Sequence, residues 1–274
     1  MEFLTILLSS LLALISPGNL VIDKVLESNL RSRLNKVEQL QVRVDNAPSY
    51  QIAQGKIERV RIAGRGLWLT PDIRLGALEV ETDPINANLQ RLTRGGSKSA
   101  PDLLQQPAQA GVRLVLTQAD INNALKSPTV TAHLRRLGSS LAGTSGEPYE
   151  FINPRVEFLS PNRVRFQVKL QKKDGDESLA LMAESGIQFT SGHRLDLIEP
   201  VATINGQPLS PRIVAGFAEG ISRRFNLRNW EDAGMIIRVL QLEIDKSELE
   251  IAAFIRVDSS HLTLGASPIA MRHL

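Results

Sequence analysis

Apolar and polar residues alternate along most of the chain, which is the pattern of strands with one apolar face. The alternation is strictest in residues 163–170, where Val164, Phe166, Val168 and Leu170 share one face. Turn residues follow, and two more alternating segments return before residue 205. Consecutive hairpins of this kind predict an antiparallel meander. A further hairpin is predicted at the C-terminal end, from segments 235–244 and 249–257.

The first half of the chain alternates in the same way, most clearly in residues 57–82. Within this stretch, strict alternation would place Leu75 on one face of the strand and Leu78 and Val80 on the other face, and Gly76 lies between them. A change of phase by one residue at a glycine predicts a β-bulge. Because bulged strands bend, we expect a curved sheet.

Helical spacing appears in two longer segments, each with apolar residues three or four positions apart. In residues 20–37 the apolar positions include Ile22, Leu26 and Leu30. In the segment that begins at Ser210 and Pro211 they include Ile213, Phe217 and Ile221. Two short helices are also predicted, one over residues 83–92 and one opened at Thr117 by a capping box. These patterns predict helices that cover a sheet.

Residues 3–15 form an uninterrupted run of apolar and small hydroxyl residues, FLTILLSSLLALI. A helix of this length covers about 20 Å, which is short of the ~30 Å hydrocarbon core of a bilayer. An export signal, a shallow membrane anchor and a buried core helix all fit the run. A basic n-region and a cleavage motif are both missing. The first two alternatives place the protein at a membrane.

The composition excludes several kinds of chemistry. Cysteine is absent, which removes disulfides, thiolate catalysis and Cys-ligated metals. The 32 basic and 29 acidic residues are interleaved along most strands, which disfavours a nucleic-acid interface. None of the four histidines has a suitable companion in the sequence, and no catalytic motif is found. We therefore expect a protein that is not an enzyme and that needs no metal or cofactor.

One part of the chain resembles a known family. Residues 37–85 read VEQLQVRVDNAPSYQIAQGKIERVRIAGRGLWLTPDIRLGALEVETDPI. This segment is similar to the LmeA-like family of bacterial cell-envelope phospholipid-binding proteins. The likeness lies in the amphipathic helix that leads into a strand, in Gly55-Lys56-Ile57, and in the acidic strand that ends at Asp83-Pro84-Ile85. It continues through LTQADINNAL, residues 116–125, and covers most of the chain after Gly18.

The resemblance implies an α+β fold of elongated, curved antiparallel sheets wrapped around amphipathic helices, similar to tubular lipid-binding domains. It implies non-catalytic binding of phospholipid acyl chains in an apolar groove, with transfer of the lipid as a further expectation. We expect an apolar export signal or anchor in residues 1–16 and a single elongated domain in residues 17–274. The implied location is the periplasm or the membrane-associated cell envelope, with phospholipid and the membrane surface as partners.

The residues expected to contact lipid are the apolar positions of the two amphipathic helices, of two alternating strands, and one tryptophan. They are Ile22, Leu26, Leu30, Trp68, Val164, Phe166, Val168, Leu170, Ile213, Phe217, Ile221, Leu249, Ile251 and Ile255. The same residues could instead form an ordinary packed core. The alternative function is a structural or scaffold protein of the envelope that recruits an unidentified protein partner through a sheet edge.

Overall fold

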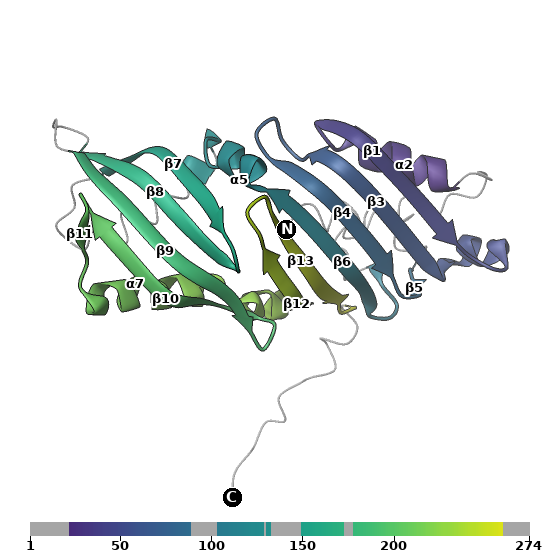
Figure 1. Cartoon of the computed structure of the whole chain (residues 1–274). Coiled ribbons are helices and arrows are strands. Elements are labelled where there is room, and N and C mark those ends of the chain that lie inside the picture. The colour runs from purple at the N-terminus through teal and green to yellow at the C-terminus, as the bar shows by residue number, and fades with distance from the viewer. Residues whose placement is uncertain (1–21, 89–102, 129, 133–148, 173–177, 260–274) are drawn as a thin grey trace, which may run out of the picture.

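The computed structural model describes residues 22–88, 103–128, 130–132, 149–172 and 178–259 (Figure 1). The N-terminal apolar run of residues 3–15 therefore lies outside the described residues, as do His133, His261 and His273. Antiparallel sheets with a few helices make up the described part, which confirms the predicted α+β class. The two main sheets lie side by side along the long axis of the molecule in Figure 1.

The first sheet has six strands and is built from both ends of the described chain. Its spatial order is β1 (Lys36–Asp45), β3 (Arg59–Trp68), β4 (Arg74–Thr82), β6 (Ala108–Thr117), β13 (Glu248–Val257) and β12 (Met235–Ile244). Every neighbouring pair is antiparallel. The predicted C-terminal hairpin is thus confirmed, and it completes a sheet begun more than a hundred residues earlier.

The second sheet is the predicted meander. Its spatial order is β11 (Gln207–Pro208), β10 (Arg194–Ile204), β9 (Ser178–Thr190), β8 (Arg163–Lys172) and β7 (Tyr149–Leu159). Register shifts interrupt the pairing of β7 with β8 and of β10 with β9. These irregularities bend the strands, as bulges do.

The longer helices of the described residues are α2 (Ile22–Ser32), α5 (Gln118–Ala124) and α7 (Pro211–Arg224), and residues 128 and 130–132 are helical as well. Short 3-10 helices occupy Ser49–Gln54 and Leu227–Ala233. The predicted capping box of α5 is confirmed, because the Thr117 hydroxyl accepts from the Asp120 backbone N–H and the Asp120 carboxylate accepts from that of Thr117. Helix α2 ends five residues before the predicted end of residue 37, since β1 begins at Lys36.

The helix predicted over residues 83–92 is wrong in the part that the structure describes. Ile85–Asn86 forms the short strand β5, which pairs with β2 (Lys56–Ile57). The side chain of Ile85 is buried beside the core, as is that of Ile57. Burial of this apolar pair outweighs the local capping signal of Asp83.

The predicted bulge at Gly76 is also wrong, although the phase change is present. Strands β3 and β4 keep one register throughout, so no extra residue is inserted. Instead the chain turns over at Gly66, whose φ of +55° favours glycine. Leu67 then folds across Gly64, where an added Cβ would lie 2.7 Å from a methyl of Leu67. Leu67 and Leu75 consequently enter the same core as Leu78.

The packed core lies on the α2 side of the six-stranded sheet. Leu26 and Leu30 of α2 are buried there, at 1% and 5% exposure, against Leu40 and Val42 of β1. The core continues through Val60, Ile62, Leu78 and Val80 on the neighbouring strands. It ends in half-buried residues of β6, among them Leu114 and Leu116.

Side chains clamp the two sheets together at both ends of their shared border. On α5, Asn122 bonds both the N–H and the C=O of Val156 in β7, at 2.7 and 2.8 Å, and Gln118 accepts from Phe158. In the β7–β8 turn, Asn162 bonds both backbone groups of Ile244 in β12. These bonds fix the orientation of the second sheet relative to the first.

Candidate functional site

One face of the five-stranded sheet is almost entirely apolar. The register places Phe166 of β8 between Val156 of β7 and Ala183 of β9. Leu170 likewise lies between Phe151 and Leu179 on those strands. Because side chains two residues apart point to the same side, these rows form a continuous aliphatic and aromatic surface.

This apolar face is only partly covered. Phe158 and Val168 are buried, but Val164, Phe166 and Leu170 keep part of their surface accessible. The apolar residues of β9 on the same face, Leu179 and Leu181, are half-buried as well. Among the described residues, this face is less fully buried than the core beside α2, so it offers apolar surface to a ligand.

Helix α7 runs beside β10, the last long strand of this sheet. Val214 is buried, and Ser222 lies near the carboxylate of Asp196 on β10. At 100° per residue, Val214 and Ser222 define the flank of the helix that meets β10. The adjacent flank of the helix carries Ile213, Phe217 and Ile221. Viewed down the helix axis, Phe217 lies between the two isoleucines, and this flank is turned away from Ser222.

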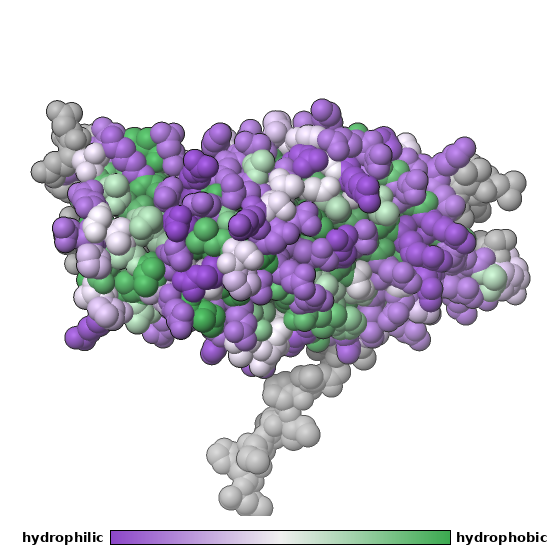
Figure 2. All heavy atoms as spheres, in the orientation of Figure 1, coloured by the Kyte–Doolittle hydropathy of each residue, from purple (hydrophilic) through white to green (hydrophobic). Residues whose placement is uncertain are grey.

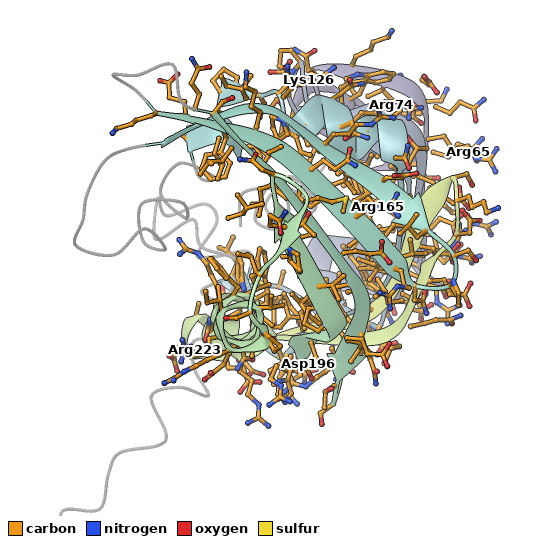
Figure 3. All side chains as sticks on the ribbon, turned by 60° about the vertical axis from the view of Figure 1, so that its left-hand side comes forward. Arg65, Arg74, Lys126, Arg165, Asp196 and Arg223 are labelled. Carbon is orange, nitrogen blue, oxygen red and sulfur yellow. The ribbon has the colours of Figure 1, made fainter. Side chains whose placement is uncertain are left out.

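That second flank of α7 is apolar and partly open. Ile213 is 48% exposed, Ile221 is 37% exposed and Phe217 is half-buried. In Figure 3, which looks almost along α7, the helix lies on the open side of the curved sheet, and the labelled Arg223 points away from the sheet. The apolar flank and the apolar sheet face therefore belong to the same side of the molecule.

The residues expected from β13 continue this apolar surface on the first sheet. Leu249 and Ile251 are half-buried and pair with Leu116 and Leu114 of β6. Ile255 is buried on the same face. Their neighbours on β6 already pack against the core below α2, so this part of the surface is more nearly closed.

The remaining expected residues are placed elsewhere. Leu26 and Leu30 belong to the packed core, and α2 would have to move before a ligand could reach them. Ile22 begins α2, but its side chain lies outside the described part of the structure. Trp68 ends β3 between two cations, with Lys36 Nζ 4.7 Å and the Arg74 guanidinium carbon 4.9 Å from its ring centroid. Cation–π contacts of this kind hold the ring in a polar setting.

Sequence reasoning missed the contributions of β7 and β9 to the apolar face. Phe151, Leu179 and Leu181 carry the same alternation as β8, and this was the available signal. Only the register shows that they lie beside the β8 residues. The candidate surface is therefore wider than the single strand expected.

The opposite faces of both sheets carry ion pairs. Arg113 on β6 bonds both carboxylate oxygens of Glu250, at 2.6 and 2.7 Å, and also reaches Glu79. The hydrogen bonds from Arg113 lower the pKa of Glu250. Hydrogen bonds from Arg61 and then Arg43 likewise lower the pKa of Asp45. In both cases the ion pair stabilises the charged carboxylate, and the lower pKa is the result.

Two hollows lie outside the apolar face. One, of about 800 Å³, crosses β1, β3, β4, β6 and β13. Its lining combines the paired charges Arg61, Glu79 and Arg113 with Asp23 and Glu27 of α2 and with the core-face residues Val42, Ile62 and Val80. The other, of about 460 Å³, lies where β12 approaches β9, and its lining includes Arg163 and Leu240. None of the residues expected to contact lipid lines either hollow.

Neither a metal cluster nor a membrane-spanning helix occurs among the described residues. These contain no group of three His, Cys, Asp or Glu side chains placed to hold a metal ion. Among their helices, none is long and apolar enough to cross a membrane.

Comparison with known proteins bears on the apolar face. No curated protein and no solved structure matches the chain. A family model described as LmeA-like phospholipid-binding matches residues 14–254, which include all the described strands except the end of β13. A match over this much of the sequence confirms the resemblance noted above, and the chain belongs to the LmeA-like phospholipid-binding family.

Proposed function

We propose that the protein binds phospholipid without catalysis and holds its acyl chains between the apolar face of the five-stranded sheet and α7. The half-buried row of Val164, Phe166 and Leu170, opposite the open flank of α7, carries this proposal. Buried Val168 forms the floor. The family match supports a phospholipid as the ligand.

The energetics favour retention of a lipid on such a surface. Apolar area removed from water contributes about 25 cal/mol per Å². If an acyl chain covers about 200 Å² of combined apolar area, the contribution is about 5 kcal/mol. This offsets part of the cost of ordering the chain and favours a lipid that stays bound during purification.

We propose further that the binding path extends along the first sheet, past Leu249 and Ile251 to Ile255. The side-chain clamps between the sheets keep the two apolar surfaces in a fixed relation. A path of this kind would make the fold similar to tubular lipid-binding domains and would suit transfer as well as storage. Leu26, Leu30 and Trp68 are not part of the proposed path.

The alternative function, a scaffold that recruits a partner through a sheet edge, needs strands with free backbone groups. Side chains or neighbouring chain segments engage parts of three outer strands, β1, β7 and β12. Asp23 accepts from Val44 in β1, Asn122 bonds Val156 in β7, and Gly192 accepts from Val239 in β12. These contacts disfavour the addition of a further strand.

Native mass spectrometry of the purified full chain tests the proposed function. We expect a population heavier than the protein by the mass of a phospholipid, which organic extraction should release intact. A stoichiometric protein partner with no lipid would support the scaffold instead. Recovery of only the unliganded mass, including after incubation with phospholipid vesicles, would contradict lipid binding.

We propose that the protein acts at the bacterial cell envelope, in the periplasm or on a membrane. The apolar run of residues 3–15 supports this location, because it is too apolar for a tail in water. We expect the full chain in the membrane or periplasmic fraction of a bacterial host, and a version without residues 3–15 in the cytosol. Recovery of both forms from the cytosol would contradict the proposed location.

A further inference from the structure

Exposed apolar side chains lie along α7 and directly after its C-terminal end. Of the eight large apolar residues with the greatest exposure in the described part, three lie on α7 or directly after it: Ile213, Ile221 and Phe225. Phe225, which follows the last turn of α7, is 53% exposed. Met182, Ile198 and Val201 are exposed on the other, ion-paired face of the sheet. Figure 2 shows hydrophobic side chains over β9 and β10 on the left of the view, and these do not belong to the α7 edge. Apolar surface concentrated in this way marks a contact region.

The same edge carries the basic excess of the protein. The segment 211–228 contains four arginines and one glutamate, a net charge of +3. The whole chain has 32 basic and 29 acidic residues, also +3, so the remainder holds 28 of each and is neutral. Figure 3 shows one of the four, Arg223, pointing away from the protein.

Three of these arginines have no ion-pair partner among the described residues. Arg212, Arg224 and Arg228 are exposed, and none forms an ion pair or side-chain hydrogen bond with another described residue. Arg223 pairs with Glu219 one turn away, which neutralises the one acid of the segment. The guanidinium groups of Arg212, Arg224 and Arg228 are therefore available to an anionic surface.

We propose that this edge, formed by α7, Phe225 and Arg228, docks the protein on an anionic phospholipid bilayer. Apolar residues bordered by arginines suit the boundary between headgroups and acyl chains, where the cations meet lipid phosphates. The inference rests on the proposed function in one respect: α7 also borders the proposed lipid path, so docking there would bring the path to the membrane. The charge and the exposure of the α7 edge do not depend on whether a lipid is bound in the path.

Vesicle co-sedimentation with the full chain tests the docking. The probe is a vesicle of phosphatidylglycerol and phosphatidylcholine in equal parts, compared with phosphatidylcholine alone. The variant replaces Arg212, Arg224 and Arg228 by glutamine. Its matched control replaces Arg33, Arg65 and Arg155, which are exposed and without an ion pair among the described residues, and changes the charge equally.

At about fivefold in affinity for each arginine near an anionic surface, the triple variant is expected to bind the anionic vesicles about 100-fold more weakly. The matched control should bind within about threefold of the parent. Raising the salt from about 0.1 M to about 1 M should also weaken parent binding strongly, because the Debye length falls from about 10 Å to about 3 Å. Equal loss in the two triple variants, or no loss in either, would overturn the assignment of this edge.

An apolar variant separates docking from a purely electrostatic attraction. Phe225→Ser is expected to reduce vesicle binding about tenfold, while Tyr50→Ser, at an exposed aromatic far along the chain, should leave it unchanged. Phe225 is outside the proposed lipid path, so both variants should retain co-purifying phospholipid. If Phe225→Ser and the variant that replaces the three arginines both retain lipid and bind vesicles as well as the parent does, the docking proposal is refuted and the proposed function is not. If the protein binds vesicles but retains no lipid, the proposed function is refuted and the docking proposal is not.

Discussion

Replacement of Asp120 by alanine is expected to lower the free energy of unfolding by about 3 kcal/mol. Asp120 is 4% exposed, and its two carboxylate oxygens accept from Arg74 Nη1 at 3.0 and 3.1 Å. One of them also accepts from the backbone N–H of Thr117. The loss falls at the lower end of the range for buried pairs, because the Arg74 side chain is 26% exposed and keeps a contact with Glu38.

The effect of this substitution should reach both sheets. Asp120 caps α5, and α5 carries Gln118 and Asn122, which hold β7 against the first sheet. We propose that residues 17–274 form one cooperative domain, so that chemical denaturation monitored by circular dichroism gives a single transition at a lower denaturant concentration in the variant. Two separate transitions, with only one of them shifted, would contradict a single domain.

Two control variants assign the cause. Asp120→Asn keeps an oxygen that can accept from Thr117 but loses the charge opposite Arg74, and about half of the loss is expected. Asp72→Ala removes an exposed aspartate in the β3–β4 turn and should change stability by no more than about 0.5 kcal/mol. A parental unfolding curve for Asp120→Ala would show that the clamp does not depend on this carboxylate.

Replacement of Phe166 and Phe217 by asparagine is expected to reduce phospholipid binding about 100-fold. Phe166 lies on the half-buried sheet face, and Phe217 lies on the flank of α7 that borders it. If lipid covers half of each ring, each substitution forfeits about 1–1.5 kcal/mol, or about tenfold in affinity. The two losses should add if the same acyl chain contacts both rings independently.

The measurement is the amount of phospholipid extracted per mole of purified protein, together with the melting temperature. A wall of a lipid path should tolerate Phe217→Asn with a modest loss of melting temperature, whereas a packed core would lose several kcal/mol. Ala215→Asn, on the exposed side of the same helix, controls for helix propensity. An unfolded Phe217→Asn variant, or a folded one that retains parental lipid, would remove Phe217 from the path.

The sequence by itself determined most of the elements. Period-two alternation located β8, β9, β10 and the C-terminal hairpin, because one face of each strand must be apolar to be buried. The Thr117–Asp120 capping box and the Ser210-Pro211 start located α5 and α7, since both signals act through local backbone hydrogen bonds or a fixed φ. Charge counting also excluded a uniformly basic surface.

Only the tertiary structure decided which apolar residues are packed and which remain open. Leu26 and Phe217 each belong to a row of apolar residues three or four positions apart on an amphipathic helix. Leu26 is nevertheless enclosed by β1 and its neighbours, whereas Phe217 keeps accessible surface. Tertiary burial likewise made residues 85–86 a strand, and the turn-over at Gly66 brought Leu67 into the core without a bulge. Periodicity reports which side of an element is apolar, whereas closure of that side depends on partners distant in the chain, such as β13 beside β6, whose positions no local pattern encodes.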